Sequence, residues 1–285
     1  MTNAKQIKCL FLPLLQRNDD LIQIDRFSVW IKPIRHVVCR VTIDSTSDPD
    51  LFDPDFSLTP IYWEMTDFKT GPGSYTEDFG TEPPLPKLTV EYRHQPKYWT
   101  LPDYIERLAI LQARRQWRWS DPEIPRIFLT IVETEILPLL RRMAQDNAAY
   151  AAYHRTDIVP DGRAHVVQRW AVALAAGALD EAREIQAVLM RSYEVDRYGD
   201  YQPPDPIVWP RNGERKRGYR EAYVKAIDCV AYRRRRHRFL EVAEPLRLGD
   251  RAAIAAALHR WEAEAVRSAY YERWWEPTPF PIEEG

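Results

Sequence analysis

The sequence predicts an α+β protein in which a helix and an antiparallel sheet come first and a larger all-helical part follows. Two observations predict this order. Short segments in which β-branched and aromatic residues alternate with polar ones occupy the first 65 residues. From Pro102 onward, apolar residues recur at helical spacing in longer segments. A chain of 285 residues can bury a sizeable core in one or two domains.

The first domain, residues 1–100, is predicted to hold one helix and an antiparallel sheet. Its helix is expected over 4–17, and its strands over Leu21–Ile24, Phe27–Ile31, Val37–Ile43 and Phe56–Met65. A loop rich in Asp and Pro separates the last two strands. Residues 69–102 are rich in Pro and Gly, so we expect them to be irregular and to contain the domain boundary.

The second domain, residues 101–285, is predicted to begin with a helix over 104–119 and to be organised around a long helix over Ser120–Gln145. Ser120 and Glu123 fit a capping box at its start. Apolar residues then recur along one side, which predicts a wide face for other segments to pack against. Pro138 is expected to bend this helix, because it lacks a backbone donor and clashes with the preceding turn.

Helical hairpins are predicted to complete the second domain. Helices over 163–176 and 179–193 meet at Gly177, and a glycine in the same position relative to its helix, Gly249, recurs in 247–261. A long loop over 201–218 and a helix over 219–244 lie between the hairpins. We expect the aromatic and Pro-rich C-terminal tail to pack over the helices as a strap, with a partner-binding surface as the alternative.

Sequence motifs give no catalytic, cofactor-binding or metal-ligating residues. The chain has no Walker loop, GxGxxG or G-x-S-x-G, and its six histidines lack the i, i+4 and HxH spacing of metal sites. Three widely separated cysteines are typical of a reduced, cytoplasmic protein, and no segment predicts a membrane span. An active site assembled from distant segments stays open.

Two charged clusters are the candidate binding sites. Residues 41–86 contain ten acidic side chains and one base, Lys69, so this part of the chain predicts an acidic surface for a basic protein partner. Its candidate residues are Asp44, Asp48, Asp50, Asp53 and Asp55. Residues 211–238 contain eleven Lys or Arg and three acids, with tyrosines nearby, which is one footprint of nucleic-acid binding. The candidate contacts there are Arg233, Arg234, Arg235, Arg236 and Arg238, with pairing to neighbouring acids as the other explanation.

About residues 1–195 resemble a known group of proteins in the order of their segments. The resemblance is carried by RHVVCRVTIDSTSD at 35–48, TPIYWEM at 59–65, FLTIVETEILPLLRRM at 128–143 and the alanine-rich hairpin with Gly177. This order resembles uncharacterised bacterial proteins whose N-terminal domain has no assigned function. Some of those proteins are proposed as immunity proteins beside polymorphic toxins.

The expected function is therefore a non-enzymatic protein-binding role, with immunity-like neutralisation of a bacterial toxin as its specific form. The acidic surface, the absence of catalytic motifs and the resemblance favour it. A nucleic-acid-associated protein that uses the arginine-rich helix over 219–244 is the first alternative, and a hydrolase with a dispersed site is the second. The oligomeric state stays open.

Overall fold

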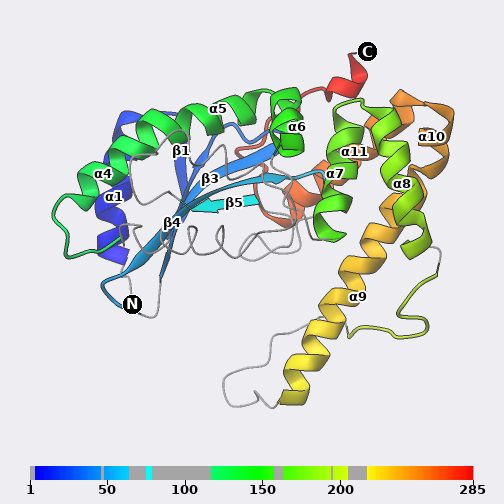
Figure 1. Cartoon of the computed structure of the whole chain (residues 1–285), viewed down its shortest axis with the longest axis horizontal. Helices are drawn as coiled ribbons and strands as arrows, with labels where there is room; N and C mark the ends of the chain where they lie inside the picture. Colours follow the sequence, from blue (N-terminus) through cyan, green and yellow to red (C-terminus); the bar gives the residue numbers. More distant parts are fainter. Residues whose placement is uncertain are drawn as a thin grey trace, which may run out of the picture.

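The computed structural model describes residues 4–45, 48–63, 75–78, 117–156, 163–193, 195–204 and 217–284. Within these residues the predicted α+β class is confirmed: a helix, an antiparallel sheet and then a larger group of helices follow one another along the chain (Figure 1). The boundary predicted near residue 100 and most of the helix predicted over 104–119 lie outside the described residues. At the end of that predicted helix, Arg118 instead forms an isolated bridge with Leu51.

The sheet is an antiparallel meander in the order β1-β2-β3-β4-β5. Its strands are β1 Leu21–Asp25, β2 Ser28–Ile31, β3 Val37–Ser45, β4 Phe52–Pro60 and β5 Tyr75–Asp78. β4 begins four residues earlier than expected, inside the predicted Asp- and Pro-rich loop. The early start follows from period-two alternation, because Phe52 and Phe56 point into the core while Asp53 is exposed. β5 lies in the segment that was expected to be irregular.

Helices cover one face of this sheet (Figure 1). They are α1 Ala4–Arg17, α4 Ile124–Ile131, the π-helix η1 Val132–Ile136 and α5 Leu137–Gln145. Phe128, Val132, Leu137 and Leu140 are fully buried in one core cluster with residues of α1 and the sheet. The long helix thus provides the packing face that its apolar stripe predicts.

The structure corrects one prediction about the long helix and shows the form that another one takes. The predicted capping box is wrong: α4 begins at Ile124 with Glu123 as N-cap. The Ser120 hydroxyl instead donates to Asp50, in the turn between β3 and β4, at 2.8 Å. The expected distortion at Pro138 takes the form of η1, where the Leu137 N–H bonds to the Val132 carbonyl five residues earlier. A widened turn directly before the proline relieves the clash of its ring with the preceding turn.

Tyr150 and Ala151 of the next helix, α6 Asn147–Thr156, still belong to the first core cluster, whereas the helices after α6 form a second group with its own core. They are α7 Arg163–Ala175, α8 Leu179–Tyr193, α9 Arg217–Glu241, α10 Ala243–Leu248 and α11 Arg251–Ser268, followed by the short 3-10 helix η2 Pro281–Glu283. Trp170, Phe239 and Trp261 are buried at its centre. The predicted hairpins at Gly177 and Gly249 are confirmed, with φ of 72° and 71°. α9 extends away from this group as a long rod (Figure 1).

The C-terminal tail packs as a strap, which confirms the first of the two expectations for it. Ile34, in the β2–β3 connection, bridges in parallel to Trp275, and Tyr271 packs on Trp30 with ring centroids 5.1 Å apart. Phe280 and Ile282 are completely buried. The strap therefore ties the helical group to the sheet face that α4 and α5 leave uncovered.

Within the part of the chain that the structure describes, there is neither a disulfide nor a membrane-spanning helix. All three cysteines lie within the described ranges as free thiols, with Cys9 exposed and Cys39 and Cys229 buried. No helix in the described ranges combines the length and the apolar character needed to cross a membrane.

Candidate functional site

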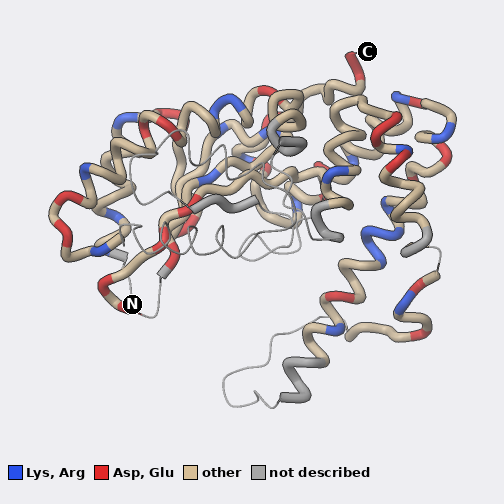
Figure 2. The backbone as a smooth tube through the Cα atoms, in the orientation of Figure 1, with Lys and Arg blue, Asp and Glu red and all other residues tan. Residues whose placement is uncertain are grey.

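Three of the five predicted acidic residues come together on one face of the sheet. Asp44 on β3 lies directly opposite Asp53 on β4, and Asp55 lies opposite Thr42 two positions along. Residues paired across strands point to the same face. The opposite face of the same strands is apolar, since Ile43 and Phe52 are buried in the core. Asp44, Asp53 and Asp55 form what we call the acidic face, at the outer end of the β3–β4 hairpin (Figure 2).

Asp44 and Asp53 form a cross-strand pair of like charges. Like charges directly opposite each other destabilise an antiparallel pair. Both residues are exposed, so their carboxylates are presented outward.

Arg40, a basic residue on the same face of the sheet, lies next to the acidic face. Its Nε donates to the Ser57 hydroxyl at 2.7 Å. Burial lowers the pKa of the Arg40 guanidinium, while the negative charges of Asp55, Asp25 and Asp44 act in the opposite direction. Arg40 therefore offsets part of the negative charge at the inner end of the acidic face, next to the strap.

The other two predicted acidic residues have structural roles in the β3–β4 turn. The Asp48 carboxylate accepts the Asp50 N–H at 2.9 Å. Asp50 accepts the Ser120 N–H and hydroxyl at 2.9 and 2.8 Å and lies 3.3 Å from Arg118. The hydrogen bond from the Ser120 side chain is the main cause of the lowered pKa of Asp50. These contacts fasten the turn to the segment that precedes α4.

The arginine run on α9 is mostly engaged by the chain itself. Arg233 pairs with Asp196 at 2.8 Å and also donates to the Gly199 carbonyl, and Arg236 donates to the Tyr193 carbonyl. Arg235 donates to the Ala231 carbonyl at 3.3 Å, one turn back in its own helix.

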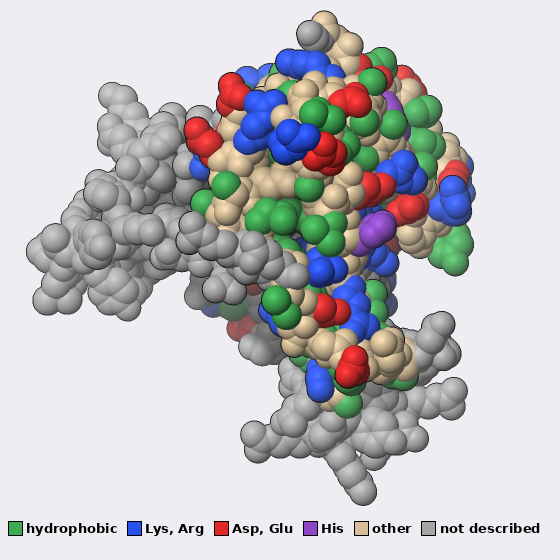
Figure 3. Space-filling view, turned by 90° about the vertical axis from the view of Figure 1, so that its right-hand side faces the viewer, with side chains coloured by type: hydrophobic (Ala, Val, Ile, Leu, Met, Phe, Trp, Pro, Cys, Tyr) green, Lys and Arg blue, Asp and Glu red, His purple; other side chains and the backbone are tan. Residues whose placement is uncertain are grey.

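The other two arginines of the run, Arg234 and Arg238, differ sharply in exposure. Arg238 is only 5% exposed, with its guanidinium 5.2 Å from the centre of the Trp261 ring, whereas Arg234 is exposed. Around the helical group, acidic and basic side chains alternate on the surface in view (Figure 3). These contacts favour the structural explanation of the run.

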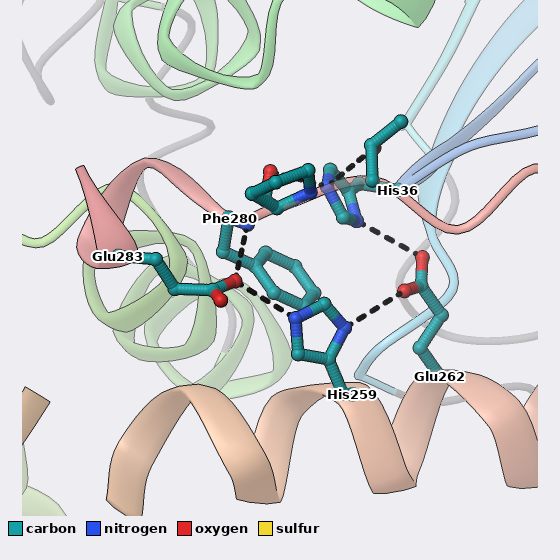
Figure 4. Close-up of polar contacts among 7 residues, drawn as sticks. His36, His259, Glu262, Phe280 and Glu283 are labelled. Carbon is teal, nitrogen blue, oxygen red and sulfur yellow. Dashed lines mark hydrogen bonds and ion pairs between the residues drawn. The ribbon is translucent and has the colours of Figure 1, made fainter. Parts of the chain in front are cut away.

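A cluster of titratable residues that the sequence did not indicate joins the ends of the chain. His36, in the β2–β3 connection, places Nδ1 3.0 Å from Oε1 of Glu262 on α11 (Figure 4). His259, one turn earlier on α11, places Nε2 2.8 Å from Oε1 of Glu283 in η2. His259 Nδ1 lies 3.9 Å from the second oxygen of Glu262. We call these four residues the His–Glu clamp.

Phe280 lies at the centre of the His–Glu clamp (Figure 4). Its ring stacks on His36 at 3.9 Å and lies 4.8 Å from the His259 ring, and the Tyr62 ring meets its edge at 5.3 Å. The Phe280 N–H donates to Glu283 at 2.7 Å. The strap is thus held here both by an apolar anchor and by ionisable partners.

The inner pair also contacts the strap. His36 Nε2 lies 3.1 Å from the Pro279 carbonyl oxygen and 3.0 Å from the Thr278 hydroxyl. A buried carboxylate without a partner would be strongly destabilising, so the contact with His36 stabilises Glu262 in the core.

Burial gives the inner pair a structural role. The side chains of His36 and Glu262 are 7% and 0% exposed, so a substrate has no access to them. The outer pair, His259 and Glu283, is about one-third exposed. Among the described residues, no group of His, Cys, Asp or Glu has the arrangement of a metal site.

The available sequence signal for this cluster is the i, i+3 spacing of His259 and Glu262 on one helix face. It does not identify His36 or Glu283, because those residues meet α11 only through the tertiary fold.

Comparison of the chain with protein-family models, curated protein sequences and solved structures found no match.

Proposed function

We propose that this chain is a non-enzymatic protein-binding protein whose acidic face receives a basic protein partner. The observation that carries the proposal is the Asp44–Asp53 pair, two exposed carboxylates set directly opposite each other on β3 and β4. A cationic side chain of the partner could contact both carboxylates at once. Electrostatic complementarity of this kind also speeds association and disfavours acidic competitors.

The partner class we propose first is a basic bacterial toxin, which would make the chain immunity-like. The resemblance of residues 1–195 to bacterial proteins proposed as immunity proteins supports this choice. An acidic face suits a nuclease in particular, because enzymes that bind nucleic acid carry a basic surface.

The experiment is a tagged purification of the chain from cells that express it, with and without nuclease treatment. We expect one basic protein in stoichiometric amount, retained after nuclease treatment. The paired variant Asp44→Lys/Asp53→Lys should lose that protein. This variant replaces one like-charged cross-strand pair by another, so the sheet keeps the same kind of repulsion while the sign of the charge changes.

A matched control changes the same amount of charge elsewhere. Asp19 and Asp200 are both exposed and lie outside the acidic face. Asp19→Lys/Asp200→Lys should retain the partner. Equal recovery of the partner by both double variants would show that the acidic face is not its binding site. Recovery that depends on intact nucleic acid would favour the arginine-rich helix instead.

A further inference from the structure

Three helices of this chain end with the same pattern of backbone hydrogen bonds. At each end, one N–H bonds to a carbonyl five residues earlier, and the preceding N–H bonds three residues back. At the end of α7 the bonds are Ala178 to Ala173 and Gly177 to Leu174. At the end of α10 they are Asp250 to Pro245 and Gly249 to Leu246. At the end of α11 they are Tyr271 to Val266 and Tyr270 to Arg267. This is the Schellman motif, which requires a left-handed residue after the helix.

The third motif has a tyrosine where the other two have glycine. Tyr270 has φ of 59° and is the one described non-glycine residue with positive φ. A bulky side chain in this region is a conformational outlier, because its Cβ crowds the backbone. The Tyr270 side chain is 82% exposed, so burial does not compensate for the unfavourable backbone. The strain sits where α11 ends and the strap begins.

The strap continues from this strained residue to anchors at its other end. Ile34 makes two backbone hydrogen bonds with the strap. Its N–H donates to the Trp274 carbonyl at 2.8 Å, and its carbonyl accepts from the Glu276 N–H at 2.9 Å. Beyond them come Phe280 and the bond between Glu283 and His259. The hinge therefore favours opening, while the anchors favour closure.

We propose that residues 271–284 form a releasable strap, hinged at Tyr270 and locked by the contact between Glu283 and His259, which opens as a unit while α11 and the sheet stay folded. In the open state Tyr270 relaxes to right-handed geometry, and α11 can extend as far as the residue before Pro277. Opening uncovers Trp30, Ile34 and Val38, which are buried under the strap when it is closed. Arg40 lies above Trp30, with its guanidinium 5.5 Å from that ring, so opening would also expose the inner edge of the acidic face.

Native-state hydrogen exchange of the full chain tests this proposal. The reporter amides are Ile34 and Glu276, whose hydrogen bonds join the strap to the β2–β3 connection. Reference amides are those of the β3–β4 ladder, which holds the centre of the sheet. We expect the reporters to exchange through an opening at least about a hundredfold more frequent than global unfolding, as a locally cooperative unit does. Equal opening constants for reporters and reference amides would overturn the proposal.

Two variants separate the hinge from the side chain that occupies it. Tyr270→Gly removes the positive-φ penalty and should make strap opening about fivefold rarer. Tyr270→Ala removes the aromatic ring but keeps the penalty, so strap opening should stay near the wild-type frequency. If the two variants change the frequency of strap opening equally, backbone strain at Tyr270 does not contribute to opening and the proposal fails.

A third variant tests the lock. Glu283→Gln keeps the size of the side chain and removes the charge that faces His259. Strap amides should then exchange about fivefold faster, in keeping with the strength of charge-assisted hydrogen bonds, while the β3–β4 amides keep their wild-type rates. Faster exchange of strap and sheet amides together would mean that the contact between Glu283 and His259 supports the whole fold, and would overturn its role as a local lock.

Discussion

His36 and Glu262 lie 226 positions apart in the chain, and their side chains meet at 3.0 Å with almost no exposure to solvent. This contact joins the β2–β3 connection to α11, and through Thr278 and Pro279 it also joins the strap. It is the point where the sheet, the helical group and the C-terminal segment depend on one another.

Breaking this pair should destabilise the whole protein. Removing one member of this buried pair leaves the other without its partner, so His36→Leu should lower the free energy of unfolding by about 3–5 kcal/mol. Glu262→Met should have a similar effect. The double variant His36→Leu/Glu262→Met should lose much less than the sum, because it leaves no unpaired charge. Urea denaturation of the four proteins measures this, and strictly additive losses would contradict the pairing.

The positive-φ glycines should respond to alanine in a defined order. A Cβ at Gly177 would lie 3.0 Å from Arg251 Nη1 and 3.3 Å from the Ile282 Cα, whereas at Gly249 the nearest atom is 3.4 Å away and at Gly199 none lies within 4 Å. Each glycine-to-alanine substitution should lower the free energy of unfolding by about 1 kcal/mol, because alanine is unfavourable in the left-handed backbone conformation. Gly177→Ala should cost more than this, because the backbone of the strap would have to shift. Thermal denaturation checks the order, and a loss at Gly199 as large as that at Gly177 would contradict it.

The contribution of Glu283 should disappear in acid. Burial disfavours its charged form, but the Phe280 N–H and the His259 ring favour it more, and the pKa of Glu283 is lowered. Because the folded state binds this proton less readily than the unfolded state, the stabilisation is present above the ordinary glutamate pKa of about 4.3 and is lost as pH falls through the lowered folded value. The stability difference between wild type and Glu283→Gln should therefore shrink as pH falls from about 6 to about 3. A constant difference over that range would contradict the assignment.

Arginines on α9 should affect stability more than nucleic-acid binding. Arg236→Lys removes a hydrogen bond to the Tyr193 carbonyl, at 2.8 Å, that lysine is not shaped to restore, and should cost about 1 kcal/mol. Arg234→Gln, at an exposed position, should change stability by less than about 0.5 kcal/mol. Fluorescence anisotropy with labelled DNA and RNA is the companion measurement. Binding that weakens steeply with salt and is reduced by Arg234→Gln would instead support the nucleic-acid alternative.

Local patterns predicted most of the elements correctly. Alternation located β1 to β3, helical periodicity located α1 and the long helix, and the two glycines located the hairpin turns. The errors occurred where a distant partner decides the local structure. Ser120 has the sequence of an N-cap, but Asp50, which lies 70 positions earlier, engages its hydroxyl.

The same distinction between local patterns and distant contacts decides which parts of the candidate sites the sequence predicts. The acidic residues could be found because charge density is visible in a single segment, but only the strand register shows that Asp44 and Asp53 face each other while Asp50 fastens a turn. His36, Glu262 and Glu283 come from three separate parts of the chain, so no spacing rule predicts their contact. Tyr270 resembles any exposed tyrosine in the sequence, and its left-handed backbone becomes evident only from the structure.

The most direct test of the central claim is the affinity of the purified partner for wild-type protein and for Asp44→Lys/Asp53→Lys, measured by isothermal titration calorimetry at two salt concentrations. Close charge pairs at protein interfaces contribute at least about 1.5 kcal/mol each. We therefore expect the variant to bind at least about a hundredfold more weakly at low salt, with a smaller difference at high salt, where exposed charges are screened. An unchanged dissociation constant would contradict the assignment of the acidic face as the binding site.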